Sequence, residues 1–198
     1  LLQQLAAAYV NDMGITSPYF PTENCTGGTQ CDTTSDDPEI DQHTLDMVEV
    51  YLQTLAVPSR RNYNEADVKH GKELFKQVGC NSCHTTQFIT GTHKSIPELS
   101  NQKIHPYTDL LLHDMGDELA DGRPDFDANG NEWRTPPLWG IGLVSIVNGH
   151  TNFLHDGRAR NLEEAMLWHF GEGENSRNKF MNLSKSEREA LIKFLNSL

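Results

Sequence analysis

The sequence predicts an all-α protein with long irregular loops, and three observations lead to this class. Apolar residues recur at helical spacing in three segments, residues 40–57, 64–79 and 183–198. No segment shows strong apolar–polar strand alternation, and no internal repeat is present. The middle of the chain, residues 85–160, is rich in Gly, Pro and Asn, with only short apolar runs. A compact domain with such a middle needs a filler for its core, and a large flat cofactor would serve.

The N-terminal part is expected to form a helical extension. Residues 1–39 predict a short helical stretch followed by loop. The next helix is stopped by Pro58, and its apolar residues lie at helical spacing: Ile40, Leu45, Val48, Leu52 and Leu55. We therefore expect an N-terminal helical and loop extension over residues 1–64 and a main domain over residues 65–198.

The main domain is expected to begin and end with amphipathic helices. The first, "NEADVKHGKELFKQVG", runs directly into a cysteine motif, and its Gly71 and Phe75 suit packing against the last helix. A shorter helix is predicted over "NLEEAMLWHF". The last helix follows Ser184 or Ser186, either of which is a typical N-cap residue.

Composition limits the class of partner. The chain has 198 residues, a net charge of −12 and no apolar run long enough to span a membrane. An acidic surface argues against nucleic acid and anionic membranes and favours a soluble protein with basic partners. The opening "LLQQLAAAYV" has no initiator Met and no signal-peptide pattern, so we expect a mature chain or an internal part of a longer precursor.

Two of the four cysteines, Cys25 and Cys31, lie in one polar loop, "PTENCTGGTQCDTTSDDPE". Such a loop is poor core material, so buried structural thiols are not expected there. A local disulfide is the preferred interpretation, against free surface thiols. An oxidising compartment, periplasmic or extracellular, would follow.

The other two cysteines form "GCNSCH", in which His84 directly follows Cys83 and Cys80 lies three residues earlier. A thiol redox pair expects a preceding strand, whereas a helix is predicted here. A zinc site needs four ligands, and neither the spacing of Cys25 and Cys31 nor the scattered histidines supplies them. The spacing fits haem attachment directly: two thioethers to the vinyl groups and His84 as proximal iron ligand. We therefore predict one covalent haem c.

Several stretches together resemble one family. They are "DMGIT", "YLQTLAVPSRR", the helix and cysteine motif, "DLLLHDMGDELADG", "EWRTPPLWGIG", "LHDGRARNLEEAMLWH" and "SEREALIKFLNSL". The chain resembles the di-haem oxidoreductases, also labelled thiol oxidoreductases, which are relatives of bacterial di-haem cytochrome c peroxidases and MauG-type enzymes. That family pairs two haem domains, whereas this chain has one Cys-x-x-Cys-His motif. The resemblance implies a cytochrome c-like C-terminal haem domain plus the segment that joins it to another domain.

The resemblance also orders the candidates for the sixth iron ligand. In "LEEAMLWHF", Leu162, Met166 and His169 share one face if the helix continues to its end. A core histidine bonded to a carbonyl is the plain alternative. The related helices carry an axial ligand at the position of His169, so His169 is preferred and Met115, in "HDMG", comes second. Bis-His ligation would give a lower potential than His/Met ligation.

Further residues are expected to serve the haem pocket. The family-like motifs imply that one or two of Arg134, Arg158 and Arg160 bind haem propionates, against plain surface arginines. His155 is expected to orient a loop, and the three tryptophans to pack around the haem: Trp133, Trp139 and Trp168.

A calcium site is also considered. The stretch "DFDANG", residues 125–130, copies the opening of a calcium loop, but Pro136 stands where the twelfth, acidic ligand belongs. An ordinary acidic turn is therefore preferred, and calcium binding is kept as the second interpretation.

The expected function is electron transfer through one haem, which relays electrons to a redox partner or to a second haem domain. The alternatives are a peroxidase or other oxidoreductase that is catalytic in its own right, and a haem domain with a structural role. The sequence itself names no substrate or redox partner.

Overall fold

The computed structural model describes residues 1–25 and 38–198, which form two compact units, Leu1–Ala56 and Val57–Leu198. The first unit contains α1 (Leu2–Asp12) and α2 (Gln42–Thr54), which pack on one another. Ala6 and Leu45 are fully buried in this unit. Asp41 caps α2 by accepting a hydrogen bond from the Thr44 N–H at 2.8 Å. Cys31 lies outside the described residues, so the Cys25–Cys31 disulfide stays a prediction.

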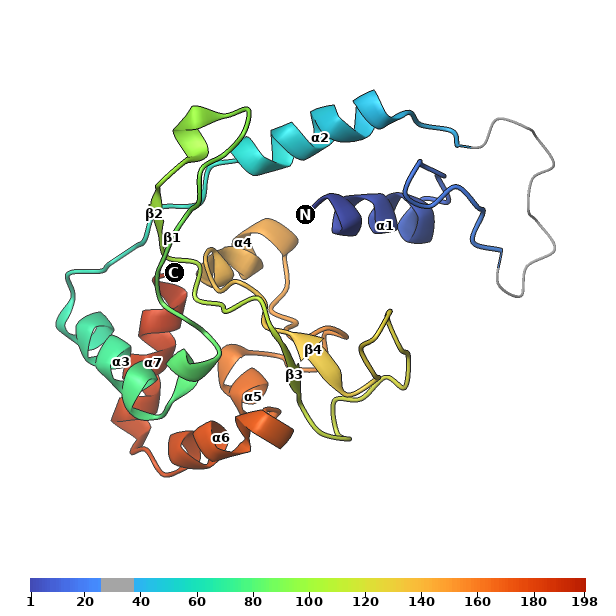
Figure 1. Ribbon diagram of the computed structural model, residues 1–198. Coiled ribbons are helices and arrows are strands. Elements are labelled where there is room, and N and C mark those ends of the chain that lie inside the picture. Colours follow the sequence, from blue (N-terminus) through green and yellow to red (C-terminus); the bar gives the residue numbers. More distant parts are fainter. Residues whose placement is uncertain (26–37) are drawn as a thin grey trace. The chain divides into compact units, whose positions relative to one another are not determined.

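The second unit is built on two helices, α3 (Ala66–Gln77) and α7 (Lys185–Asn196), which lie side by side in Figure 1. Gly71 permits this contact, because a Cβ at that position would lie 2.0 Å from the Ala190 carbonyl oxygen. The rings of Phe75 and Phe194 meet edge to face across the helix pair, with centroids 5.3 Å apart. The predicted packing of Gly71 and Phe75 on the last helix is therefore confirmed.

The helix pair anchors the main hydrophobic core. Its buried side chains come from α3, α7 and the segments that cover them: Val68, Leu74, Phe75, Val78, Tyr107, Leu138, Leu162, Phe180, Ala190, Leu191, Phe194, Leu195 and Leu198. Ser184 caps α7 in a complete capping box with Glu187. Of the two predicted caps, the structure therefore uses Ser184.

The chain between the two long helices is irregular, as expected, but it contains strands. Strands β1 (Phe88–Ile89) and β2 (Lys103–Ile104) form one antiparallel pair. Strands β3 (Leu112–Asp114) and β4 (Glu132–Arg134) form another, with His113 opposite Trp133. The described residues are thus helix-rich rather than strictly all-α. The strands have only two or three residues each, too short to give a recognisable alternation in sequence.

Three shorter helices complete the unit. They are α4 (Val144–Asn148), α5 (Leu162–Leu167) and α6 (Glu174–Met181). The prediction for "NLEEAMLWHF" is correct for its first part and wrong for its end. Helix α5 stops at Leu167, so His169 lies just beyond the helix and not on its face. The His169 N–H still reaches the Met166 carbonyl at 3.3 Å, which keeps the residue close to the last turn of α5.

Candidate functional site

The cysteine motif forms a tight turn at the end of α3. Gly79 adopts a left-handed conformation (φ 94°), which glycine accommodates without steric cost and which turns the chain away from the helix. A short 3₁₀ helix, η1 (Cys80–Ser82), follows. The His84 N–H then donates to the Cys80 carbonyl at 2.9 Å. The two thiols and the imidazole are therefore held on one compact turn.

His84 is positioned by the main chain. Its Nδ1–H donates to the Tyr107 carbonyl at 2.9 Å, and this bond leaves Nε2 as the basic nitrogen. Burial lowers the pKa of His84 to about 4, and the nearby imidazole of His169 acts in the same direction. The ring is thus neutral at physiological pH, which is the form that binds a metal.

His169 is held in the same way. Its Nδ1–H donates to the Ala165 carbonyl at 2.8 Å, and burial lowers the pKa of the ring. Met115 lies beside it: a Cβ on Gly173 would meet the His169 Cβ at 3.0 Å and the Met115 Cε at 3.3 Å. The structure therefore brings the two candidate sixth ligands together, and His169 also lies close enough to act electrostatically on His84.

The two thiols of the motif are free in the structure and poorly suited to thiolate chemistry. Burial raises the pKa of the Cys80 thiol to about 12. The pKa of Cys83 is also raised, first by burial and then by the charges of Asp109 and Glu172. Reactive Cys-x-x-Cys pairs need a lowered thiol pKa. These surroundings argue against a thiol redox centre.

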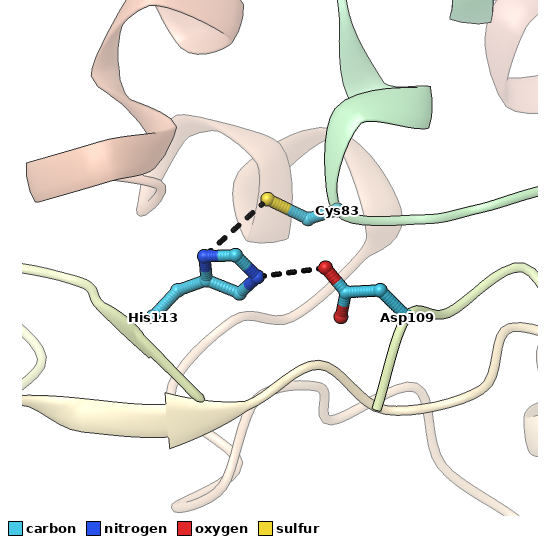
Figure 2. A group of neighbouring side chains, drawn as sticks. All are labelled: Cys83, Asp109 and His113. Carbon is cyan, nitrogen blue, oxygen red and sulfur yellow. Dashed lines mark hydrogen bonds and ion pairs between the residues drawn. The ribbon is translucent and has the colours of Figure 1, made fainter. Parts of the chain in front are cut away.

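Figure 2 shows a cluster beside Cys83 in which His113 lies between the thiol and Asp109. The His113 Nε2 is 2.9 Å from an Asp109 carboxylate oxygen, and the Nδ1 is 2.8 Å from a Glu172 oxygen. The Cys83 Sγ lies 3.8 Å from the same Nδ1. Carboxylates accept hydrogen bonds, so both ring nitrogens donate and the ring is an imidazolium. The bond to Glu172 is the main cause that raises the pKa of His113.

This cluster bears on two interpretations. Because both ring nitrogens of His113 are engaged, His113 is a poor candidate for an iron ligand. The ligand atoms of Cys83, Asp109 and His113 all lie within 4.8 Å of one another, but the protonated ring of His113 has no lone pair to offer a metal ion.

Trp133, which the sequence suggests for haem packing, pairs with His113 across the β3–β4 ribbon. Directly paired residues of two strands share a face, so Trp133 is on the same face of the β3–β4 ribbon as His113. Its ring stacks on His155, with centroids 3.6 Å apart. The Trp133 Nε1 is buried and has no hydrogen-bond partner among the described residues. A haem propionate would supply an acceptor, so this donor fits the expected cofactor.

The three predicted arginines are not gathered at one place. Arg160 is 82% exposed and pairs with Glu164 at 2.8 Å. Arg134 neighbours Trp133 in β4, so its side chain points to the opposite face of the ribbon. Arg158 lies over the Trp168 ring, 4.9 Å from its centroid. Of the three, Arg158 is placed best for a role near the ligand segment, and propionate binding stays a prediction.

The stretch predicted as a calcium loop is an exposed turn. Asp125 and Ala128 exchange two main-chain hydrogen bonds across it, at 3.1 and 3.0 Å. Within the described parts of the chain, the one group of three or more metal-ligand side chains is that of Cys83, so Asp125 and Asp127 belong to no such group. Calcium binding stays a prediction without structural support.

Three participants were not predicted: the Tyr107 carbonyl, Asp109 and Glu172. A main-chain carbonyl carries no sequence signal. Asp109 and His113 are four residues apart, which indicates proximity only on a helix, whereas here the chain enters a strand. Glu172 reaches the cluster from a segment far along the chain, and no local pattern could have indicated that contact.

The chain belongs to the family described as "Di-haem oxidoreductase, putative peroxidase", which matches residues 1–198. Membership gives the chain a haem-related oxidoreductase role and haem as its cofactor. No curated protein and no solved structure shows a significant match to the chain. Across the described residues, no helix is both long enough and apolar enough to cross a membrane.

Proposed function

We propose that the unit Val57–Leu198 is a c-type cytochrome domain that carries one covalent haem and transfers electrons. Cys80 and Cys83 would form the thioethers, and His84 and His169 would be the axial iron ligands. The bound haem would supply an iron that exchanges one electron.

The pair of half-buried imidazoles with matching hydrogen bonds carries this proposal. Each ring donates its Nδ1–H to a main-chain carbonyl, at 2.9 Å for His84 and 2.8 Å for His169. Each therefore keeps Nε2 as a basic nitrogen with fixed orientation, the arrangement that metal-binding histidines use.

The residues of the chain set the surroundings of the iron. Burial lowers the pKa of both imidazoles, which favours the neutral form that binds a metal. The Tyr107 and Ala165 carbonyls fix the tautomers, so that neither ring has to reorient when the iron changes charge. Small reorganisation favours rapid electron transfer over bond-making chemistry.

The wider role is that of a relay. The family is a di-haem family, whereas this chain has one Cys-x-x-Cys-His motif. We infer that electrons pass between this haem and a second haem domain or a separate redox protein. Covalent haem and the expected Cys25–Cys31 disulfide both favour a periplasmic or secreted location.

A peroxidase that is catalytic in its own right is the second candidate, and the His113 cluster favours it. Peroxide cleavage needs an open iron position and a nearby acid–base group. The imidazolium of His113, between Asp109 and Glu172, lies beside Cys83 and so close to the expected haem edge. This group could supply a proton if His169 left the iron.

The covalent haem is tested by denaturing mass spectrometry. We expect a mass equal to the polypeptide plus one haem, and acid–acetone should leave the haem on the chain. Changing Cys80 and Cys83 to Ser should release it. Extraction of the haem from the unchanged chain would contradict the proposal.

The axial ligands are tested by absorption and electron paramagnetic resonance spectra. The unchanged protein should show low-spin bis-His iron. His169→Ala should convert the iron to a high-spin or cyanide-binding form, and Met115→Ala should leave the spectra nearly unchanged. A methionine charge-transfer band in the unchanged protein, or the reverse pattern in the variants, would assign the ligand to Met115.

Steady-state peroxide turnover separates relay from enzyme. With both axial positions filled, the unchanged chain should stay at background rate, and His169→Ala should gain activity by about tenfold or more, since an open position is required. Fast turnover by the unchanged chain with no gain in the variant would favour the catalytic alternative.

A further inference from the structure

A cavity of about 250 Å³ lies within the unit Val57–Leu198. Tyr107 is the one lining residue that also contacts a proposed haem ligand, since its carbonyl accepts a hydrogen bond from His84. Its basic lining side chains are Arg60, Lys103 and His105, and its aromatic ones are Tyr107 and Trp139. The other lining residues are aliphatic, and no carboxylate side chain lines the cavity. Two cationic side chains, Arg60 and Lys103, thus line the cavity without an Asp or Glu beside them.

Main-chain hydrogen bonds hold the walls of the cavity in place. The Arg61 N–H donates to the Ser197 carbonyl at 2.9 Å, which ties the segment containing Arg60 to the end of α7. The Leu138 N–H donates to the Pro106 carbonyl at 2.9 Å, which sets Trp139 beside the segment containing Tyr107. The His105 Nδ1–H donates to the Thr86 carbonyl at 2.9 Å. The walls are therefore fixed before any ligand arrives.

The cavity has more hydrogen-bond donors than acceptors. The Arg60 guanidinium lies over the Phe194 ring and donates to the Ser197 hydroxyl at 3.0 Å. Its Nε is buried and, in the part of the chain that the structure describes, has no partner. An incoming acceptor would satisfy this nitrogen.

A second cavity in the same unit, by contrast, is lined by both basic and acidic side chains. That cavity, of about 440 Å³, is also lined by basic side chains, but two glutamates line it with them. Its Arg188 lies 3.2 Å from Glu163, and its Lys185 lies 3.9 Å from Glu189. Its cations thus have carboxylate partners in the cavity wall, whereas no Asp or Glu side chain lines the cavity around Tyr107.

We propose that the cavity lined by Arg60, Lys103 and Tyr107 binds a small aromatic carboxylate. Arg60 and Lys103 supply the cationic donors that recognise a carboxylate. Trp139 and the aliphatic side chains of the wall supply apolar surface for an aromatic ring. The cavity is smaller than the roughly 300 Å³ at which drug-sized pockets begin, so a single-ring acid is the matching size.

This site is separate from the haem ligands but shares one residue with them. Tyr107 lines the cavity, and its carbonyl holds His84. The binding proposal does not depend on the redox role, because the ligand contacts neither Cys80 nor Cys83 nor their motif. A failure of the haem assignment would leave it standing, and the reverse also holds.

Equilibrium dialysis of the purified full chain with radiolabelled benzoate tests the site. Benzamide, which has the same shape without the charge, is the matched ligand. We expect one benzoate to bind per chain. The affinity for benzamide should be lower by about tenfold or more. The difference should shrink in high salt, because a partly exposed charge pair is screened.

Two lysine variants locate the site. Lys103→Met removes a cation from the cavity wall and should weaken benzoate binding about tenfold, while Lys94→Met removes an exposed lysine outside the cavity and should change nothing. Lys103 is itself exposed, so its variant should fold normally, which circular dichroism checks. Absence of benzoate binding, equal binding of benzamide, or equal effects of the two variants would each overturn the proposal.

Discussion

At the scale of single residues, the site depends on which nitrogen of each histidine is free. His84 and His169 each donate a hydrogen bond from Nδ1 to a carbonyl, which leaves Nε2 with its lone pair. In His113, by contrast, both ring nitrogens donate to carboxylates. The same side chain therefore serves as a neutral ligand in two places and as a fixed cation in the third. Burial favours the neutral form of His84 and His169, and the neighbouring charges of Asp109 and Glu172 favour the protonated form of His113.

The His113 cluster predicts a pH dependence of stability. The pKa of His113 is raised above 6.5, so its stabilisation is complete below pH 6.5 and is lost as pH rises through the folded-state pKa. The pKa of Glu172 is lowered from 4.5, chiefly by the bond to His113, so its stabilisation is present above pH 4.5 and is lost as pH falls through the lowered value. The cluster is thus most stabilising between these limits.

Glu172→Gln should lower the upper limit of the pH range over which the His113 cluster stabilises the fold. The pKa of His113 should fall toward 6.5, which proton NMR titration would measure. Unfolding by urea at pH 7 should show a loss below about 1 kcal/mol, because the Glu172 side chain is 56% exposed. Glu98→Gln, at an exposed position, is the control. An unchanged His113 titration would mean that the bond to Glu172 does not form in solution.

At the scale of elements, the contact between α3 and α7 organises the domain. Gly71 lets the two helices approach, and the Phe75 ring packs on Phe194 one turn later. Because α3 leads directly into η1, this contact also fixes the position of the cysteine motif. The site is therefore positioned by the best-packed pair of helices in the unit.

Gly71→Ala should destabilise the domain although alanine favours helices. The helical preference would contribute about 0.5–1 kcal/mol in favour of alanine. The new Cβ would lie 2.0 Å from the Ala190 carbonyl oxygen and 2.8 Å from the Phe194 Cβ, so the helices must separate. We expect a net loss of about 1–3 kcal/mol in the free energy of unfolding.

The control for this substitution is Gly91→Ala, where an added Cβ has no neighbour within 4 Å. Chemical denaturation of both variants against the unchanged chain measures the difference. A Gly71→Ala variant as stable as Gly91→Ala would show that the helix pair can relax at no cost.

At the scale of the whole molecule, the second unit has a dense core at one pair of helices and a sparse middle. Large apolar side chains are exposed along that middle: Leu110, Leu111, Leu112, Phe126, Ile146 and Val147. The irregular segments between residues 85 and 160 thus bury little apolar surface of their own. A covalent cofactor would add the missing contacts.

Loss of haem should therefore unfold much of the domain. The chain with Cys80 and Cys83 changed to Ser should lose most of its far-ultraviolet circular dichroism, because a group that binds only the folded state stabilises it. His169→Ala, which keeps the thioethers, should stay folded and is the control. A haem-free chain with full helical signal and cooperative unfolding would contradict this expectation.

The sequence by itself determined the local features of this protein. The Cys80–Cys83–His84 spacing, the Ser184 cap and the periodicity of α3 and α7 are each encoded within a few neighbouring residues. Short-range hydrogen bonds and helical spacing depend on residues three or four apart, so they can be predicted from the sequence. The wrong end of the helix near His169 shows the limit, because a periodic pattern does not say where the chain leaves the helix.

Only the tertiary structure decided what converges on the site. The Tyr107 carbonyl on His84, the carboxylates on both sides of His113, the two short β-ribbons and the cavity at Arg60 all join segments distant in the chain. Such contacts arise when α3 and α7 pack and the irregular middle closes around them. Their energies depend on burial and on the surrounding charges, which packing creates and which no local pattern of residues specifies.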